Sequence, residues 1–365
     1  LISKMYSHIF LSNIVFLCIS YTVAHYTNVT SIDKTSFCGN ERKILIIGGA
    51  GFIGTALRDR WHKEMADACI FAADRNGRTF VEPHLNFIRA DETQVEDDFL
   101  IQMSIVIYLG GLSGRVKCEN SLAGAAKREN VNAILSLARR MHASQLLVFA
   151  STGAILEGSG RIPANETSLL NIKLYDAYTH SMYERERQLE KLSIGHVNSP
   201  RMIGLRFGTV TGISPSQRLD TVHMALVCAA HLTGRLNVTH LESSRAFLWM
   251  HDLSLAMWRI IETYDTNKNR FEIYNLASFN AIIGKVATTI AMKTGAIIDA
   301  HDHATHLDII GFSLDTSKFQ RDYNFTFRGI HEYIVDELIA NVPCLCVGRE
   351  LVDRSASQIN TYASG

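Results

Sequence analysis

Three glycines at a fixed spacing, Gly48, Gly51 and Gly54, separate the apolar run KILII from a segment with helical periodicity. The first glycine permits a tight turn, the second lets the backbone approach a pyrophosphate, and the third lets helix and strand pack closely. Twenty residues after Gly54, the next apolar run ends at Asp74, where a carboxylate binds the ribose hydroxyls of an adenosine. The spacing predicts a dinucleotide site.

The carboxylate of Asp74 also indicates which dinucleotide binds. It repels the 2′-phosphate of NADP, although the neighbouring Arg75 would offset part of that repulsion. NAD is therefore the expected cofactor, and NADP is the less favoured alternative.

Three histidines, His301, His303 and His306, have a spacing that raises the question of a metal site. Nothing near them in the sequence completes a ligand set, and the surrounding segment reads as a solvated loop. We expect no metal.

Overall charge excludes some partners. The chain has 365 residues with 36 Lys+Arg and 36 Asp+Glu, so no basic field favours nucleic acid or an anionic membrane. Hydrophobic residues make up 47% and charged residues 20% of the chain, as in ordinary globular proteins.

Strand-like and helix-like segments alternate from residue 43 onward. The patterns predict strands over 43–48, 69–74, 85–91, 104–111, 145–152 and 201–210, and helices over 54–64, 129–143 and 178–192. This alternation predicts an α/β fold, a Rossmann-type doubly wound parallel sheet with helices on both faces. Ligands bind at the carboxyl edge of such a sheet.

The alternation loosens after residue 212. Helices over 221–234 and 281–295 and strands over 235–241 and 270–278 predict a smaller α/β unit that closes over the carboxyl edge. The expected organisation is a leader over 1–40, an NAD-binding domain over 43–212, a substrate-binding region over 213–340 that is interleaved with the sheet, and a tail over 341–365.

The apolar segment over 8–24 resembles the hydrophobic region of a signal peptide ending at Ala24. An uncleaved anchor, an organelle leader and a mis-assigned start are the alternatives. A signal over 5–24 would place the protein in the secretory pathway or an organelle lumen, and otherwise it would be cytoplasmic. Four N-x-[ST] triplets suit a lumen but also arise by chance. The seven scattered cysteines read mostly as buried thiols, which leaves the redox compartment open.

Several short blocks, taken in order, resemble one family. They are GGAGFIG (48–54), IRAD (88–91), VIYLGG (106–111), FASTGAIL (149–156), GLRFGTVTG (204–212) and LDTSK (314–318). Together they resemble the extended short-chain dehydrogenases, specifically the NAD-dependent epimerase/dehydratase family that acts on nucleotide sugars. The likeness covers about residues 43 to 335.

This resemblance implies a set of cofactor-binding residues. The glycine loop with Phe52 and Ile53 would hold the pyrophosphate, and Asp91 would contact the adenine. The full implied set is Gly48, Gly51, Phe52, Ile53, Gly54, Asp74, Asp91, Leu109, Gly110, Tyr178 and Met182.

The resemblance also implies catalytic residues, with one departure. Thr152 corresponds to the family's Ser/Thr, and Tyr178 to the tyrosine of its Tyr-x-x-x-Lys helix, but Met182 occupies the lysine position. A catalytic Tyr178 is the favoured interpretation. A structural Tyr178 and a register based on Tyr175 are the alternatives.

The missing lysine matters because its ammonium group stabilises tyrosinate. Free tyrosine titrates at about 10, and a positive charge at roughly 4 Å lowers that pKa by up to ~3 units at an effective dielectric constant of ~20. Methionine contributes nothing to this effect. An efficient base at neutral pH therefore needs another source of positive charge.

On the substrate side, the resemblance implies that Arg245 and Arg218 hold the nucleotide diphosphate, with the guanidinium group making paired hydrogen bonds. Thr209 stands where many relatives carry an asparagine near the sugar diphosphate.

Three functions are consistent with these residues. The first is an NAD-dependent nucleotide-sugar epimerase or dehydratase that transiently oxidises a sugar carbon. The second is a catalytically impaired protein that binds the dinucleotide, and the third is a reductase of a non-sugar substrate. By analogy with the family, a homodimer would form through the helices over 129–143 and 178–192.

Overall fold

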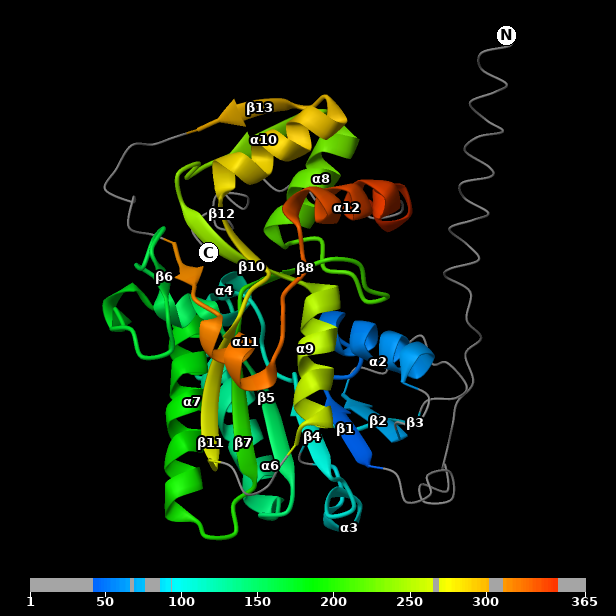
Figure 1. Ribbon diagram of the computed structural model, residues 1–365, viewed down its shortest axis with the longest axis vertical. Coiled ribbons are helices and arrows are strands. Elements are labelled where there is room, and N and C mark those ends of the chain that lie inside the picture. Colours follow the sequence, from blue (N-terminus) through cyan, green and yellow to red (C-terminus); the bar gives the residue numbers. More distant parts are fainter. Residues whose placement is uncertain are drawn as a thin grey trace.

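A parallel sheet of seven strands, in the order β3-β2-β1-β4-β5-β7-β11, forms the centre of the molecule (Figure 1). The computed structural model describes residues 42–65, 69–75, 86–92, 94–264, 269–301 and 311–346. The strands are β1 (Lys43–Ile47), β2 (Cys69–Asp74), β3 (Asn86–Arg89), β4 (Ile105–Tyr108), β5 (Leu146–Thr152), β7 (Arg201–Phe207) and β11 (Phe271–Leu276). Strand order reverses between β1 and β4, where such sheets bind ligands. The predicted Rossmann-type α/β fold is confirmed.

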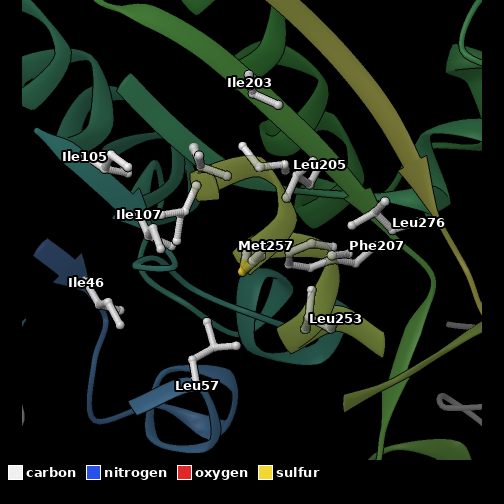
Figure 2. Close-up of a cluster of buried hydrophobic side chains, with 14 of the residues drawn as sticks. Ile46, Leu57, Ile105, Ile107, Ile203, Leu205, Phe207, Leu253, Met257 and Leu276 are labelled. Carbon is white, nitrogen blue, oxygen red and sulfur yellow. The ribbon is translucent and has the colours of Figure 1, made fainter. Parts of the chain in front are cut away.

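Helices cover both faces of this sheet. The helices α2 (Phe52–Glu64), α9 (Met250–Glu262) and α11 (Ser317–Tyr323) pack on one face, and α3 (Asp97–Leu100), α6 (Ala133–Arg140) and α7 (Ala177–Gly195) pack on the other. Successive residues of β1 serve opposite faces, since Ile46 packs toward α2 and α9 while Leu45 packs toward the α6 side. Figure 2 shows the first of these cores, with Leu57 of α2 and Met257 of α9 against the strands.

The helix predicted over 129–143 begins in a π-helical turn and ends at Arg140. Helix α5 (Ala125–Lys127) leads into the π turn Arg128–Asn132, which continues as α6. A π turn inserts an extra residue into the helix and often occurs at functional sites. Here it contains the fully buried Asn130.

The region over 213–340 is interleaved with the main sheet, as expected, so the boundary at residue 212 does not separate the sheet from the smaller unit. The strand predicted over 270–278 was placed in the smaller unit, but β11 pairs in parallel with β7 at the edge of the main sheet. The predicted strand over 201–210 also divides: β7 ends at Phe207, and β8 (Thr209–Thr211) joins a different sheet. Periodicity identifies a strand but not its partner, which long-range packing selects.

The smaller unit lies above the carboxyl edge of the main sheet (Figure 1). Its helices α8 (Val222–Thr233), α10 (Ile283–Thr294) and α12 (His331–Cys346) share one apolar core. Its sheets pair β8, β10 (Ser244–Trp249) and β12 (Phe279–Ile282); β9 (Arg235–Val238) and β13 (Ile297–Ala300); and β6 (Pro163–Ala164) and β14 (Ser313–Leu314). The remaining helices of the described residues are the short segments α4 (Arg115–Glu119), Gly153–Leu156 and Ile172–Leu174. Helix α12 runs through the boundary expected at residue 340.

Two cysteines differ from the sequence interpretation. Cys69 and Cys228 are each disulfide-bonded, whereas Cys118 is a buried free thiol. Sequence spacing did not reveal the bonded cysteines, because pairing depends on which parts of the chain meet. The proposed leader over 1–40 lies outside the described residues. Within the described part, no helix combines the length and apolar character needed to cross a bilayer.

Candidate functional site: a dinucleotide cavity beside a tyrosine helix

A cavity of about 550 Å³ opens at the carboxyl edge of the main sheet, within the usual size range of ligand pockets. Its wall brings together every residue that the sequence singled out for cofactor, catalysis or substrate. These are Gly48, Gly51, Phe52, Ile53, Gly54, Asp74, Asp91, Leu109, Gly110, Thr152, Tyr178, Met182, Thr209, Arg218 and Arg245. Their individual roles remain predictions.

The glycine loop makes close backbone contacts that larger residues would prevent. Gly48 has a φ of 82°, and a Cβ there would lie 2.9 Å from the nitrogen of Gly110. A Cβ on Gly54 would lie 2.4 Å from the carbonyl oxygen of Gly48. Helix α2 begins at Phe52 beside this loop, and its first N–H groups have no partner within the helix. The loop therefore fits a pyrophosphate of a dinucleotide.

Acidic side chains lie at the adenosine end of the predicted site. Asp74 Oδ2 accepts a hydrogen bond from the nitrogen of Ala50 at 3.0 Å, which fixes the carboxylate beside the glycine loop. Arg75 forms an ion pair with Glu129 at 2.5 Å. Glu92 also lines the cavity, and burial raises its pKa. The cation that was expected to offset Asp74 is thus engaged by another carboxylate.

Helix α7 presents Tyr178, Met182 and Arg185 to the cavity. Their i, i+4 and i+7 spacing places them on one helix face. Asp176 caps the helix by accepting from the nitrogen of Thr179 at 2.7 Å.

Tyr178 and Thr152 both line this cavity. Thr152 Oγ1 accepts from the nitrogen of Ala154 at 3.2 Å, so its single hydroxyl hydrogen can be donated either to Tyr178 or to a ligand oxygen. Burial raises the pKa of Tyr178, while the charges of Arg185 and Arg218 and the Thr152 hydrogen bond act in the opposite direction. The pair can hydrogen-bond a substrate oxygen jointly.

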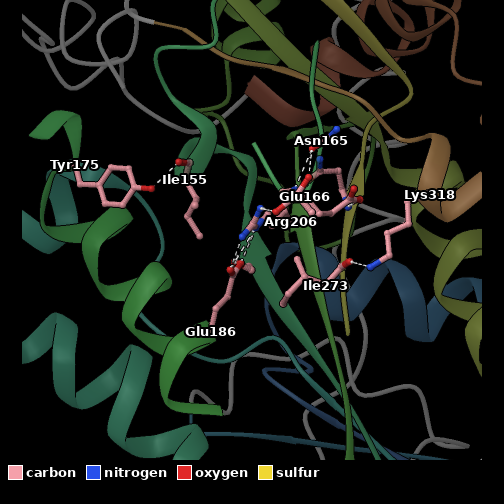
Figure 3. A network of polar contacts seen from close by, with 11 residues as sticks. Ile155, Asn165, Glu166, Tyr175, Glu186, Arg206, Ile273 and Lys318 are labelled. Atoms are coloured by element: carbon pink, nitrogen blue, oxygen red, sulfur yellow. Dashed lines mark hydrogen bonds and ion pairs between the residues drawn. The ribbon is translucent and has the colours of Figure 1, made fainter. Parts of the chain in front are cut away.

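Tyr175 lies outside the cavity wall. Its hydroxyl donates to the carbonyl oxygen of Ile155 at 2.6 Å (Figure 3), and its ring meets Tyr183 edge-on at 5.7 Å. The alternative register therefore has no support from the geometry.

Two cavity residues, Arg185 and Asn130, escaped the sequence interpretation. Arg185 is 1% exposed and lies three residues beyond the buried Met182. Asn130 Oδ1 accepts from the nitrogen of Leu112 at 2.8 Å, and its Nδ2 donates to Ser181 Oγ at 2.8 Å. The spacing of Arg185 from Tyr178 was a usable signal, whereas nothing in the sequence marked the π turn that carries Asn130.

Behind the cavity, a buried ion pair fixes α7 to the sheet. Arg206 of β7 binds Glu186 through Nη2 at 2.8 Å and Nε at 3.0 Å (Figure 3). Ser151 Oγ donates to the same carboxylate at 2.5 Å. Residues at the ends of β5 and β7 thus orient the helix that carries Tyr178.

The buried guanidinium of Arg245 lines the opposite part of the cavity. Its side chain is 2% exposed, and its Nη1 lies 4.0 Å from Glu157, which also pairs with Arg115. Among the described residues, Arg245 Nη2 has no hydrogen-bond partner. Burial lowers the pKa of Arg245 to about 10. A buried donor without a partner suits an anionic ligand.

Arg218 and Thr209 complete the predicted substrate side. Arg218 donates from Nε and Nη2 to Asp220 at 2.9 and 2.8 Å, so its fork is held in place beside the cavity. Thr209 opens β8 where the chain leaves the main sheet.

Among the described residues, no three His, Cys, Asp or Glu side chains lie close enough together to hold a metal ion. Of the three histidines considered above, His303 and His306 lie outside the described residues.

Comparison with solved structures finds the same fold with low sequence identity. MoeE5 in complex with UDP-glucuronic acid and NAD is 22% identical with a TM-score of 0.69, covering 81% of this chain and 97% of that one. TunA, an NAD-dependent NDP-hexosamine 5,6-dehydratase involved in tunicamycin biosynthesis, is 19% identical with a TM-score of 0.70, covering 86% and 100%. UDP-glucose 4-epimerase from Thermus thermophilus in complex with NAD is 19% identical with a TM-score of 0.64, covering 81% and 98%.

A family model matches directly at the sequence level. The model of the NAD dependent epimerase/dehydratase family matches residues 44–277, which include the glycine loop, Tyr178 and Arg245. The family resemblance predicted from the sequence and the NAD dependence that goes with it are confirmed. The chain belongs to the NAD dependent epimerase/dehydratase family.

Proposed function

We propose that the protein is an NAD-dependent enzyme that acts on a nucleotide sugar by transient oxidation of a sugar carbon. The supporting observation is one cavity that contains a dinucleotide cradle, the Tyr178–Thr152 pair and the unpartnered donor of Arg245. The similar proteins MoeE5 and TunA, by their descriptions, bind or act on nucleotide sugars.

The charges at the adenosine end of the cavity give a reason for the preference for NAD over NADP. Asp74, Glu92 and Glu129 all line the adenosine end of the cavity, where a 2′-phosphate would add a charge of about −2. Arg75 is already engaged by Glu129, so it would compensate this added charge only in part. When bound, NAD accepts a hydride from the sugar and later returns it.

The residues of the chain have separate tasks in this proposal. Tyr178 removes the proton of the sugar hydroxyl, and Thr152 donates a hydrogen bond to the same oxygen as negative charge builds on it. Arg245 and Arg218 bind the diphosphate. The resulting ketone acidifies its neighbouring carbons, so epimerisation, dehydration and decarboxylation share this first step. Of these three reactions, we propose epimerisation.

Tyr178→Phe tests the enzyme directly. The purified protein is assayed first for bound dinucleotide, and nucleotide sugars are then offered and their products separated by chromatography coupled to mass spectrometry. We expect Tyr178→Phe to abolish turnover and retain NAD. Tyr175→Phe is the matched control and should keep turnover, because the Tyr175 hydroxyl bonds a main-chain oxygen outside the cavity.

The buried Met182 at the lysine position favours one alternative, a protein that binds the dinucleotide without turnover. Tight NAD binding with no turnover of any nucleotide sugar, together with activity gained by Met182→Lys, would establish that alternative. Turnover by the wild-type protein that depends on Tyr178 would exclude it.

We further propose that the protein forms a homodimer through α6 and α7. We also propose, as a second and separate point, that it is located in the secretory pathway. The family resemblance supports the first proposal. The apolar segment over 8–24 and the disulfide-bonded Cys69 and Cys228 support the second. Light scattering of the purified protein tests the dimer. Sensitivity of the cellular protein to a glycosidase that removes N-linked sugars tests the location, because Asn165, Asn237 and Asn324 are exposed acceptors.

A further inference from the structure

Arg185 is a buried cation that main-chain oxygens, rather than a carboxylate, hold in place. Within the part of the chain that the structure describes, its hydrogen bonds go to main-chain oxygens only. Nε donates to Asn130 at 2.5 Å, Nη1 to Ala150 at 2.8 Å and Nη2 to Gly110 at 3.1 Å. Removing a charged group from water costs on the order of several kcal/mol when no opposite charge compensates it. The burial of Arg185 therefore needs an explanation.

The surroundings of Arg185 are shaped to admit its guanidinium group. Gly111 has a φ of 131°, and a Cβ there would lie 3.0 Å from Arg185 Nη2 and 2.4 Å from Asn130 Oδ1. The ring of Tyr108 lies on the other side, with its centroid 5.4 Å from Arg185 Cζ. A guanidinium carries five N–H donors, so two remain beyond the three that bond carbonyls.

The position of Arg185 on α7 relates it to the missing lysine. Tyr178, Met182 and Arg185 share one face of the helix and line one cavity. Met182 is 4% exposed and brings no charge. The long Arg185 side chain instead delivers a cation to this wall from one turn further along the helix.

We propose that Arg185 is a positioning residue that replaces the lysine absent at Met182 by stabilising the tyrosinate form of Tyr178. This role rests on the proposed function, in which Tyr178 is the base. It accounts for a buried cation held without a carboxylate among the described residues and for the intact cavity around a helix that lacks the lysine.

The other groups around Tyr178 do not supply an equivalent charge. The charge of Arg218 also lowers the pKa of Tyr178, but to a smaller extent than that of Arg185, and Asp220 binds Arg218 through two hydrogen bonds and places an opposing charge beside it. Thr152 contributes a hydrogen bond, and Cys118 acts in the opposite direction. Burial raises the pKa of Tyr178, and Arg185 is the largest influence that lowers it.

A purely structural role is the competing explanation, because Arg185 joins the π turn, β5 and the loop after β4. Two substitutions separate charge from hydrogen bonding. Arg185→Lys keeps the charge but loses the forked hydrogen bonds, whereas Arg185→Gln keeps an amide donor and loses the charge.

The experiment measures ionisation of Tyr178 in the full chain by ¹⁹F NMR. Biosynthetic labelling with 3-fluorotyrosine, a more acidic analogue, brings the titration into a range in which the protein stays folded. The Tyr178 signal is assigned from its absence in Tyr178→Phe. No nucleotide sugar or turnover is involved.

We expect Arg185→Gln to raise the midpoint of the Tyr178 titration by about 1 to 2 pH units, and Arg185→Lys to shift it by less than about 0.5. Adding Met182→Lys to Arg185→Gln should restore the midpoint. Arg218→Gln is the matched control and should shift it by less than Arg185→Gln does. A midpoint unchanged in Arg185→Gln, or shifted equally in the Lys and Gln variants, overturns the proposal.

If Arg185→Gln alone does not fold, the double variant Met182→Lys/Arg185→Gln is compared with Met182→Lys. The proposal requires the higher midpoint in the double variant, and equal midpoints overturn it. Failure here is distinct from failure of the proposed function. An altered midpoint without any nucleotide-sugar turnover refutes only the function, and turnover with an unaltered midpoint refutes only the role of Arg185.

Discussion

Two buried arginines beside helix α7, Arg206 and Arg185, are stabilised in opposite ways. Arg206 meets the carboxylate of Glu186, so although burial works against its charge, the ion pair raises its pKa. Arg185 meets main-chain oxygens, and burial lowers its pKa. The first arginine fixes the helix to the sheet. The second, like Arg245, holds a charge at the wall of a cavity where a ligand can use it.

The comparison indicates that the fold gains stability at the Arg206–Glu186 pair and loses stability at the cavity wall. A buried cation in a close ion pair with a carboxylate contributes rigidity, whereas one that lacks such a close pair is retained at the expense of stability. The predictions below test this distinction, beginning with the largest effect.

Removing the carboxylate of the Arg206 pair should be the most damaging change. Glu186→Gln leaves the Arg206 guanidinium buried without the carboxylate that binds it, and we expect a loss of about 3 to 5 kcal/mol in the free energy of unfolding. Urea denaturation followed by circular dichroism measures it. The double variant Glu186→Leu/Arg206→Leu should recover most of the loss. A loss below about 1 kcal/mol would show that the pair is not structural.

Removing Arg245 should weaken ligand binding without lowering the stability of the fold. Because the Nη2 of Arg245 has no partner among the described residues, and Glu157 would keep its ion pair with Arg115, Arg245→Met should leave the free energy of unfolding unchanged or higher. Calorimetry first identifies a nucleoside diphosphate that the wild-type protein binds, and binding of that ligand should weaken by about 100-fold, or ~2.7 kcal/mol. The matched control is Arg161→Met, which removes an exposed arginine and should bind the same ligand normally. Destabilisation without weaker binding would contradict the distinction.

A buried histidine differs from both arginines, because it can release its proton and become neutral. Burial lowers the pKa of His223 to about 3, and its neighbour His331 acts in the same direction. The unfolded chain takes up this proton near pH 6.5. Below that pH the unfolded state binds more protons, so the free energy of unfolding falls as the pH decreases toward 3.

At pH 5 the loss attributable to His223 should be about 2 kcal/mol relative to pH 7. Urea denaturation at both pH values measures it, and His223→Leu should flatten the dependence over this range. The exposed His180 serves as control, because His180→Leu should leave the dependence intact. An equally steep dependence in His223→Leu would assign the effect to other groups.

The smallest effect concerns the carboxylate at the cofactor end. In Asp74→Asn the amide oxygen can still accept from Ala50, so the fold should be unchanged while NAD affinity falls about 10-fold, or ~1.4 kcal/mol. Affinity for NADP should fall less or rise. Titration of tryptophan fluorescence with each dinucleotide distinguishes the two, and equal losses for both would contradict the assignment of Asp74 to the ribose.

Local signals in the sequence predicted much of the fold and the cofactor half of the cavity. Strand β2 coincides with the predicted 69–74, and α8 lies within one residue of the predicted 221–234 at each end. Alternating apolar runs and the glycine spacing depend on neighbours along the chain, so they can be read without a structure. The sheet assignment of β11 could not be read, because its partner β7 lies about 70 residues earlier.

The sequence by itself determined the order of strands and helices, the glycine loop with Asp74, and the loss of a lysine at Met182. Only the tertiary structure decided that Arg185 would face the cavity, since the carbonyls that hold it lie 35 to 75 residues away in the chain. It also decided that Arg206 would have a carboxylate partner and, among the described residues, Arg245 a donor without one. The physical reason is that the energy of a charge depends on everything packed around it in space, and spacing along the chain does not record those neighbours.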